Sequence, residues 1–362
     1  MLSKPLPANI LSWIHGKDKF FELDCPGKEW PGSTAVFKNK SISRLNMGNC
    51  KICGNGENNR TFTAREMMQG TRVEFEYMEC SACSCVQIIN VPADMTDYYS
   101  NSSYGSFIAP GKPSFKKRIR TIRNKYAIWG KGGVLGYLLN QAVPLTADYC
   151  IIKDYAKAES RILDVGCGAG SYINDLSDIG FMNVSGIDPF LEKELVYDNG
   201  LVIRKMFLEQ VTEQYDVILS HHSFEHVPLP LETLTSIKKL LRPGGVCLLT
   251  IPVAEDLYRQ YGQDCYLIQA PQHFFLYSIK SMVVLTKNVG LRVEKIMRDA
   301  TTTSNWYKYS ELWRRDISCN EAGASIDKNF THNELAEFYR TERDLNRQGK
   351  GDNITFILRN EN

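Results

Sequence analysis

The sequence has no apolar stretch of the length that secretion or membrane insertion requires. Its N-terminal region offers no signal-peptide core and is interrupted by Pro5, Pro7, His15 and Lys17. Elsewhere, no run approaches the roughly 18 consecutive apolar residues of a membrane span. We therefore expect a cytoplasmic protein without a membrane span.

Excess charge of either sign is also missing. The 43 Lys and Arg residues nearly balance the 41 Asp and Glu residues, giving a formal net charge of +2. This balance excludes a protein that binds nucleic acid or membranes over its whole surface, so such a partner would require a local patch. Repeats and low-complexity tracts are absent, and 43% hydrophobic with 23% charged residues predicts a folded globular chain. A length of 362 residues suits two domains, or one large domain with an added module.

The eleven cysteines are odd in number and scattered through a chain too large to need disulfides, which indicates a reducing compartment. Two Cys-x-x-Cys pairs, Cys50 with Cys53 and Cys80 with Cys83, are separated by 26 residues. Paired knuckles of this kind are typical of a closed tetrahedral zinc site with a structural role. Cys85 is a possible substitute ligand, and free cysteines packed in a core are the alternative to a metal site.

The sequence divides into four regions. Residues 1–44 form an irregular extension, residues 45–110 a small cysteine-anchored module, and residues 111–158 a basic connector followed by apolar helices. In residues 159–362, short apolar strands alternate with amphipathic stretches, which predicts a doubly wound parallel α/β sheet. An insertion at about 300–350 is expected to be helical, because Thr331 and Glu334 form a capping box that opens a helix to about Asn346. The seven expected strands are Arg161–Val165, Asn183–Ile187, Gly200–Arg204, Tyr215–Ser220, Val246–Ile251, Leu291–Ile296 and Asn353–Leu358.

The first of these strands ends in a glycine-rich turn. Asp164 precedes three alternating glycines, and Asp188 ends the next strand; the glycines are Gly166, Gly168 and Gly170. This spacing is typical of a nucleoside-binding crevice, although glycines also serve simply to turn a strand into a helix. A dinucleotide fingerprint has glycine where Ser171 stands, which disfavours NAD. The Asp164 carboxylate would repel a pyrophosphate and attract a cationic ligand such as S-adenosylmethionine (SAM).

On these residues the sequence resembles the class I SAM-dependent methyltransferases, whose acidic residue and Gly-x-Gly-x-Gly motif are matched by Asp164 and the three glycines. The resemblance covers about residues 160–300 and resumes at the final strand. It implies a Rossmann-like, seven-stranded methyltransferase sheet with SAM as cofactor. It also implies that Asp188 grips the ribose hydroxyls and that Phe207, beside Met206, stands near the adenine.

Three of the six histidines lie directly after the fourth strand, between His221 and His226. Residues just beyond the carboxyl ends of strands line the ligand crevice of a doubly wound sheet. Methyl transfer to oxygen or carbon usually needs a base, so His226, His222 and Glu225 are the candidate catalytic residues. The alternative is that the Glu-His pair caps the next helix and packs under the cofactor. His273 is expected either to contact the substrate or to be a structural histidine.

The zinc-knuckle module, a tyrosine-rich stretch and the Glu-His pair together resemble the nucleotide-sugar C-methyltransferases and their relatives in polysaccharide pathways. In such enzymes the zinc module helps to roof the sugar site. The resemblance implies that Tyr98, Tyr99 or Tyr104 faces the substrate, with ordinary aromatic packing between domains as the alternative.

The connector between module and sheet is strongly basic. A charge run of this kind is usually a solvated helix face, and its possible ligands are RNA, an acidic lipid surface or the diphosphate of a nucleotide sugar. Its cationic residues are Lys112, Lys116, Lys117, Arg118, Arg120, Arg123 and Lys125.

These features predict a SAM-dependent methyltransferase whose small-molecule acceptor is a sugar, a nucleotide sugar or a glycan precursor. An RNA methyltransferase is one alternative, which the near-neutral charge disfavours. A SAM-binding or scaffold protein without chemistry is the other, and in it the histidine cluster would be idle.

Overall fold

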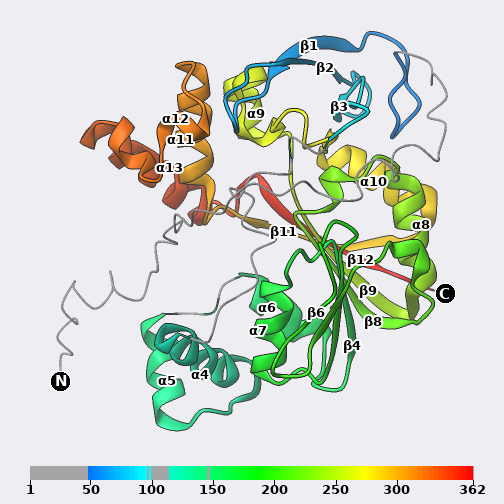
Figure 1. Ribbon diagram of the computed structural model, residues 1–362, viewed down its shortest axis with the longest axis vertical. Coiled ribbons are helices and arrows are strands. Elements are labelled where there is room, and N and C mark those ends of the chain that lie inside the picture. Colours follow the sequence, from blue (N-terminus) through cyan, green and yellow to red (C-terminus); the bar gives the residue numbers. More distant parts are fainter. Residues whose placement is uncertain (1–47, 96–97, 99–113, 144, 146, 362) are drawn as a thin grey trace.

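The computed structural model describes residues 48–361, apart from residues 96–97, 99–113, 144 and 146 (Figure 1). Two sheets organise this part of the chain, one of eight strands and one of four. Every described helix is too short or too polar to cross a membrane.

The large sheet has the strand order β11-β12-β9-β8-β4-β5-β7-β6. Its five central strands are parallel, whereas β12 runs antiparallel between β9 and β11. The sequence predicts seven strands, and all seven are present. The eighth, β6, is a two-residue edge strand too short to show alternation. The strands are β4 (Arg161–Val165), β5 (Asn183–Ile187), β6 (Leu195–Val196), β7 (Val202–Arg204), β8 (Tyr215–His221), β9 (Leu241–Pro252), β11 (Arg292–Asp299) and β12 (Asn353–Arg359).

Alternation along the central strands buries both faces of this sheet. In β8, Val217 packs into one apolar core and Ile218 into the other. Helices α6 (Ala147–Tyr155) and α7 (Ser171–Ile179) cover the first face, while α8 (Pro230–Leu240) and α10 (Ile279–Val289) cover the second. This is the doubly wound arrangement, which brings loops at the carboxyl ends of the parallel strands to one edge.

The small sheet has the order β1-β2-β3-β10 and is antiparallel throughout. Strands β1 (Arg60–Arg65), β2 (Glu74–Glu79) and β3 (Val86–Ile88) come from the cysteine module. The fourth strand, β10 (Phe275–Leu276), comes from the region that follows the histidine loop. The core of the module is therefore continuous with the core under α8 and α10.

The insertion between β11 and β12 is helical, as the sequence predicts, and Figure 1 shows it beside the module. It consists of α11 (Thr303–Arg314), α12 (Cys319–Ala322) and α13 (His332–Arg347), and the Thr331 hydroxyl caps α13 as expected. Ion pairs join it to the module, with Arg65 at 2.6 Å from Asp316 and Arg72 at 2.8 Å from Glu321. The remaining helices are α4 (Phe115–Trp129), α5 (Gly133–Ala142) and α9 (Asp256–Tyr261).

Candidate functional site

The turn between β4 and α7 requires glycine for two separate reasons. Gly166, Gly168 and Gly170 have φ angles of +72°, +55° and +73°, a region that side-chain-bearing residues rarely adopt. A Cβ added at Gly166 would also lie 2.6 Å from the Cβ of Ser223. The loop therefore folds tightly against the segment that follows β8, with its backbone open to a ligand.

Asp188 ties the next strand to this turn. One carboxylate oxygen accepts the Gly168 N–H at 2.9 Å, and the other accepts the Phe190 N–H at 2.9 Å. Burial raises the pKa of Asp188 even though both backbone donors favour the carboxylate. Each oxygen keeps a second acceptor position, so the same carboxylate can hold the loop and accept bonds from ribose hydroxyls.

Asp164 is the least satisfied acid near the turn. Its side chain is buried, and its Oδ1 has no hydrogen-bond partner in the described part of the chain. Burial, assisted by the nearby Asp188, raises the pKa of Asp164 to about 7 against the opposing influence of His221. A buried, unpartnered carboxyl oxygen is costly unless a ligand compensates it, and a positively charged ligand would do so.

The loop after β8 holds His222 in an unusual backbone conformation. His222 has a φ of +49°, and its N–H donates to the Thr250 carbonyl at 2.9 Å. Its Nδ1 lies 3.6 Å from Oε1 of Glu225, a side chain that is only 1% exposed. Burial would raise the pKa of Glu225, but the His222, His226 and His273 rings together lower it to about 2. Glu225 is therefore an ionised carboxylate surrounded by imidazoles.

His226 and His273 meet beside that carboxylate. Their rings are 4.7 Å apart and nearly perpendicular, and the ligating atoms of Glu225, His226 and His273 all lie within 4.8 Å of one another. Nδ1 of each ring lies 2.8 Å from a carbonyl oxygen, that of Gln272 for His226 and that of Leu267 for His273. Because carbonyls only accept, each Nδ1 donates, and Nε2 is left as the basic nitrogen of the neutral ring. Burial, reinforced by His226, lowers the pKa of His273 to about 3, so His273 is neutral.

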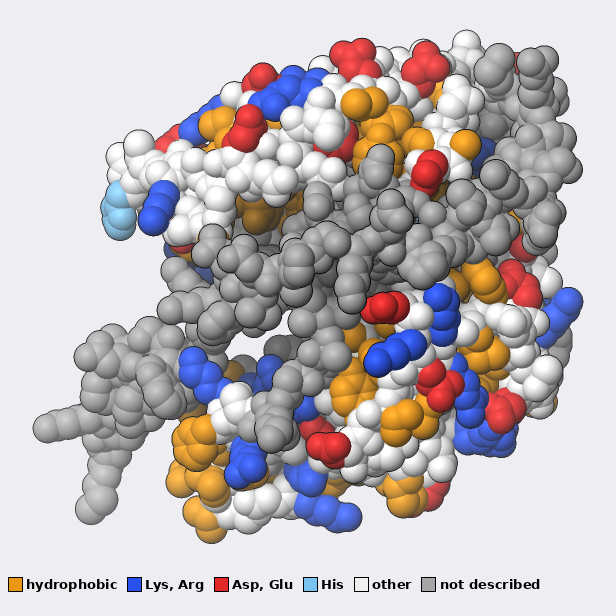
Figure 2. Space-filling view, viewed as in Figure 1, with side chains coloured by type: hydrophobic (Ala, Val, Ile, Leu, Met, Phe, Trp, Pro, Cys, Tyr) orange, Lys and Arg blue, Asp and Glu red, His pale blue; other side chains and the backbone are white. Residues whose placement is uncertain are grey.

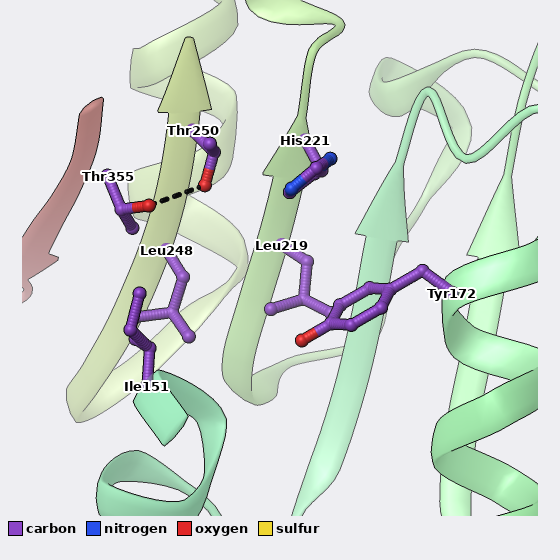
Figure 3. Close-up of a pocket in the computed structure, with 7 residues that line it drawn as sticks. All are labelled: Ile151, Tyr172, Leu219, His221, Leu248, Thr250 and Thr355. Carbon is purple, nitrogen blue, oxygen red and sulfur yellow. Dashed lines mark hydrogen bonds between the residues drawn. The ribbon is translucent and has the colours of Figure 1, made fainter. Parts of the chain in front are cut away.

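A small cavity lies between α7 and the ends of β8, β9 and β12. Its volume is about 20 Å³, room for about one water molecule. Figure 3 shows Tyr172 and His221 on one side and the hydrogen-bonded pair Thr250 and Thr355 on the other. Neither Tyr172 nor His221 is among the site residues predicted from the sequence. The available signal was position, since Tyr172 opens the helix after the glycine loop and His221 ends a central strand.

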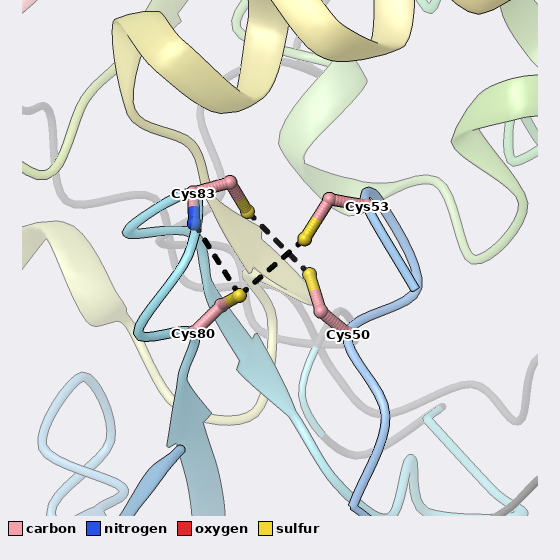
Figure 4. Close-up of side chains that lie close together, drawn as sticks. All are labelled: Cys50, Cys53, Cys80 and Cys83. Atoms are coloured by element: carbon pink, nitrogen blue, oxygen red, sulfur yellow. Dashed lines mark hydrogen bonds between the residues drawn. The ribbon is translucent and has the colours of Figure 1, made fainter. Parts of the chain in front are cut away.

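The four predicted zinc ligands lie together in the module. Cys50 Sγ is 3.6 Å from Cys83 Sγ and Cys53 Sγ is 3.5 Å from Cys80 Sγ (Figure 4). Four sulfurs about 2.3 Å from one zinc ion would be about 3.8 Å apart, so this cluster fits a tetrahedral ion with little movement. Cys85 is outside the cluster and fully buried, with its thiol directed at the Val86 carbonyl.

The module is bonded directly to the histidine loop. The Tyr77 hydroxyl donates to the His273 carbonyl at 3.1 Å, and the Phe274 N–H donates to the Glu225 carbonyl at 2.9 Å. The carbonyl of the same Phe274 accepts a bond from the Ile88 N–H of β3 at 2.9 Å. The sheet of the module thereby fixes the segment that carries His273.

The remaining predicted site residues are more dispersed. Tyr98 is half-buried, packs edge-on against Phe75 at 5.8 Å and accepts a bond at its carbonyl from the Gln272 amide. Tyr99 and Tyr104 lie outside the described residues. Phe207 is 37% exposed. Met206 lines a cavity of about 110 Å³ together with residues of β5 and β7, and this cavity is distinct from the one beside Tyr172 and His221.

The doubly wound sheet and the glycine turn after β4 agree with the expected resemblance to class I methyltransferases. Residues 140–296 match the family model described as a methyltransferase domain. The chain therefore carries a SAM-dependent methyltransferase domain of the Rossmann-like α/β type.

Part of the chain is similar in sequence to curated methyltransferases. The chain is 33% identical over 129 residues to the ubiquinone biosynthesis O-methyltransferase of Haemophilus ducreyi, covering 32% of this chain and 53% of that protein. It is 30% identical over 135 residues to the protein of the same name from Rickettsia bellii, covering 34% and 55%. The chain thus spans about half the length of the curated relatives it matches. Among solved structures, the cyclopropane synthase MmaA2 of Mycobacterium tuberculosis aligns with a TM-score of 0.37 and 17% identity, over 60% of this chain and 86% of that one.

Proposed function

We propose that the protein transfers a methyl group from SAM to a small polar acceptor. The observation that carries this proposal is the unpartnered, buried Oδ1 of Asp164 beside a turn of three glycines whose positive φ angles side-chain-bearing residues rarely adopt. SAM, when bound, supplies a positively charged sulfonium and an electrophilic methyl group. Asp164 and the glycine backbone would hold it, Asp188 would accept bonds from its ribose, and Phe207 would contact its adenine.

His226 is the proposed general base. The bond from its Nδ1 to the Gln272 carbonyl leaves Nε2 free of a proton in the neutral ring, which is the state a base needs. Glu225 would stabilise the imidazolium that forms when His226 takes a proton from the acceptor. His222, held by its left-handed backbone, is the second candidate for the same role.

The four module cysteines are proposed to bind one structural zinc ion. Four thiolates fill a tetrahedral zinc site and leave no position for a substrate, so the ion would hold the fold of the module and take no part in the reaction. Ligating thiolates must stay reduced, which supports a location in the cytoplasm.

A sugar, nucleotide sugar or glycan precursor is the proposed acceptor. Support comes from the module, which is bonded to the His273 segment and would roof the site, and from His226, which suits removal of a proton from a polar acceptor. The curated relatives, which are named ubiquinone biosynthesis O-methyltransferases, favour a second candidate, an acceptor oxygen on an intermediate of ubiquinone biosynthesis, for which a catechol serves as the model compound below. An RNA acceptor is disfavoured by the balanced charge of the chain.

The test is turnover by the purified, zinc-loaded protein. SAM is mixed separately with sugar nucleotides, with catechols and with total RNA, and release of S-adenosylhomocysteine is followed, with His226→Ala as the matched negative control. Turnover with a sugar nucleotide supports the leading proposal, and turnover with a catechol alone moves the acceptor to the second. SAM binding without turnover on any acceptor would leave a binding protein, and saturation by a nicotinamide compound in place of SAM would overturn the assignment.

A further inference from the structure

One surface of the molecule is occupied by neither the methyltransferase site nor the module. Helix α5 presents an uncharged apolar face in which Val134 is 76% exposed, Leu135 55% and Leu138 56%. These positions recur at helical spacing, so they form one stripe. The opposite side of α5 packs against α4, where a Cβ added to Gly136 would lie 2.7 Å from the Cβ of Tyr126. The exposed stripe is therefore the outer face of a tightly closed α4–α5 hairpin.

The stretch of sequence that carries this stripe contains no acidic residue. Residues 98–147 include no Asp or Glu, although the whole chain has 41. Figure 2 shows basic side chains around hydrophobic ones at the lower left, where Figure 1 places α4 and α5. An exposed apolar patch rimmed by polar residues is typical of an interaction surface.

The cations of the hairpin serve two different purposes. Lys117 lies 2.8 Å from Asp178, and Arg120 lies 2.7 Å from Asp175, so these two attach α4 to α7. In contrast, Arg118, Lys125 and Lys131 have no acidic partner among the described residues, and Arg118 and Lys131 are exposed. The ion pairs therefore account for two cations of the basic connector, and Arg118 and Lys125 are the described connector cations that an outside partner could meet.

We propose that the α4–α5 hairpin docks the protein on the surface of a membrane that contains anionic lipids. The α5 stripe would enter the boundary between headgroups and acyl chains, and the unpaired cations would meet lipid phosphates. The apolar centre of the surface argues against RNA, which binds through continuous basic and stacking surfaces. Self-association is disfavoured because two copies of this face would bring their positive charges together. The proposal does not depend on which acceptor is methylated.

The direct test is co-flotation of the full-length protein with lipid vesicles. Vesicles of phosphatidylcholine alone are compared with vesicles of phosphatidylcholine and phosphatidylglycerol in equal parts, at low and high salt. We expect binding to the anionic vesicles, weakened by salt, and little binding to the neutral ones. Equal binding to both kinds of vesicle, or to neither, would overturn the proposal.

Two variants separate the apolar and the electrostatic contributions. The double substitution Leu135→Gln and Leu138→Gln keeps good helix formers and should weaken vesicle binding by about tenfold or more. Arg118→Gln with Lys125→Gln should weaken binding to anionic vesicles by about fivefold for each cation removed. Val196→Gln, at an equally exposed apolar residue in β6, is the matched control and should bind as the unaltered protein does.

Two further measurements keep the outcome unambiguous. Thermal unfolding followed by circular dichroism reports whether each variant remains folded, so a loss of flotation by a folded variant cannot be attributed to unfolding. Light scattering reports the mass in solution. If the leucine variant only converts a dimer into a monomer and leaves vesicle binding unchanged, the face is an interface between two copies and the membrane proposal is wrong.

Discussion

The methyltransferase sheet and the cysteine module reach stability by different routes. The sheet has two apolar cores on its two faces, and its central strands are buried on both sides. The module has three short strands of its own, and β10 from the methyltransferase region is the fourth strand of its sheet. Its interior contains a cluster of four cysteine thiols. The large sheet therefore has a complete apolar core of its own, whereas the module shares a strand with its neighbour and is proposed to need a zinc ion.

Removal of the proposed zinc ion should produce the largest difference in stability between the module and the large sheet. Structural zinc contributes roughly 10 kcal/mol or more to small zinc domains, so a strong chelator should unfold the module and leave the large sheet intact. Hydrogen exchange, read separately over β1–β3 and over β4–β9, measures this difference. Cys83→Ser should have the same effect, whereas Cys247→Ser, at a buried cysteine of β9 outside the cluster, should lower stability only slightly. Uniform protection after chelation would mean that the module does not need the ion.

Replacement of His226 tests the methyltransferase domain rather than the module. It should remove the proposed general base and leave the fold intact. We expect His226→Ala to lower kcat by about 10²- to 10⁴-fold, the usual contribution of a general base. The KM for SAM and the melting temperature should stay close to their original values. His222→Ala is the matched variant, and a larger loss of kcat there would transfer the role of base to His222.

The raised pKa of Asp164 predicts a pH dependence for cofactor binding. The carboxylate form favours a cationic ligand, so affinity for SAM should be full above pH 7 and should fall as the pH drops through the pKa of about 7. The expected loss is up to about tenfold for each pH unit below that point. Calorimetry at several pH values measures it, and Asp164→Asn should bind weakly at every pH. A pH profile that persists in the Asn variant would assign the titration to another group.

The smallest predicted change in stability concerns the turns that follow the two Cys-x-x-Cys pairs of the module. Gly54 and Ser84 occupy equivalent turns, with φ angles of +79° and +56°, and each donates its N–H to the carbonyl of the first cysteine of its pair at 2.8 Å. Serine in this conformation is strained, so Ser84→Gly should stabilise the module by about 1 kcal/mol. Gly54→Ser should destabilise it by a similar amount, because an added Cβ at Gly54 meets no atom within 4 Å and only the backbone is affected. Denaturation of the zinc-loaded protein measures both.

Local patterns were sufficient to predict much of this molecule. Alternating apolar residues located the strands of the large sheet, the capping box located the start of α13, and cysteine spacing predicted which four thiols lie together. The β10 pairing was not predictable in this way, because Phe275 and Leu276 are only two residues and their partners Val86 and Gln87 are distant in the sequence. The bonds from Gly168 and Phe190 to Asp188 were missed for a related reason, since they depend on how two loops approach each other.

The contribution of β10 to the small sheet has a consequence for any shortened form of this protein. A chain that begins after the module would leave Phe275 and Leu276 without their hydrogen-bonding neighbour, and both residues would be uncovered. A bare strand edge with large apolar side chains promotes aggregation. The module and the methyltransferase domain are therefore expected to be expressed and purified only as a unit.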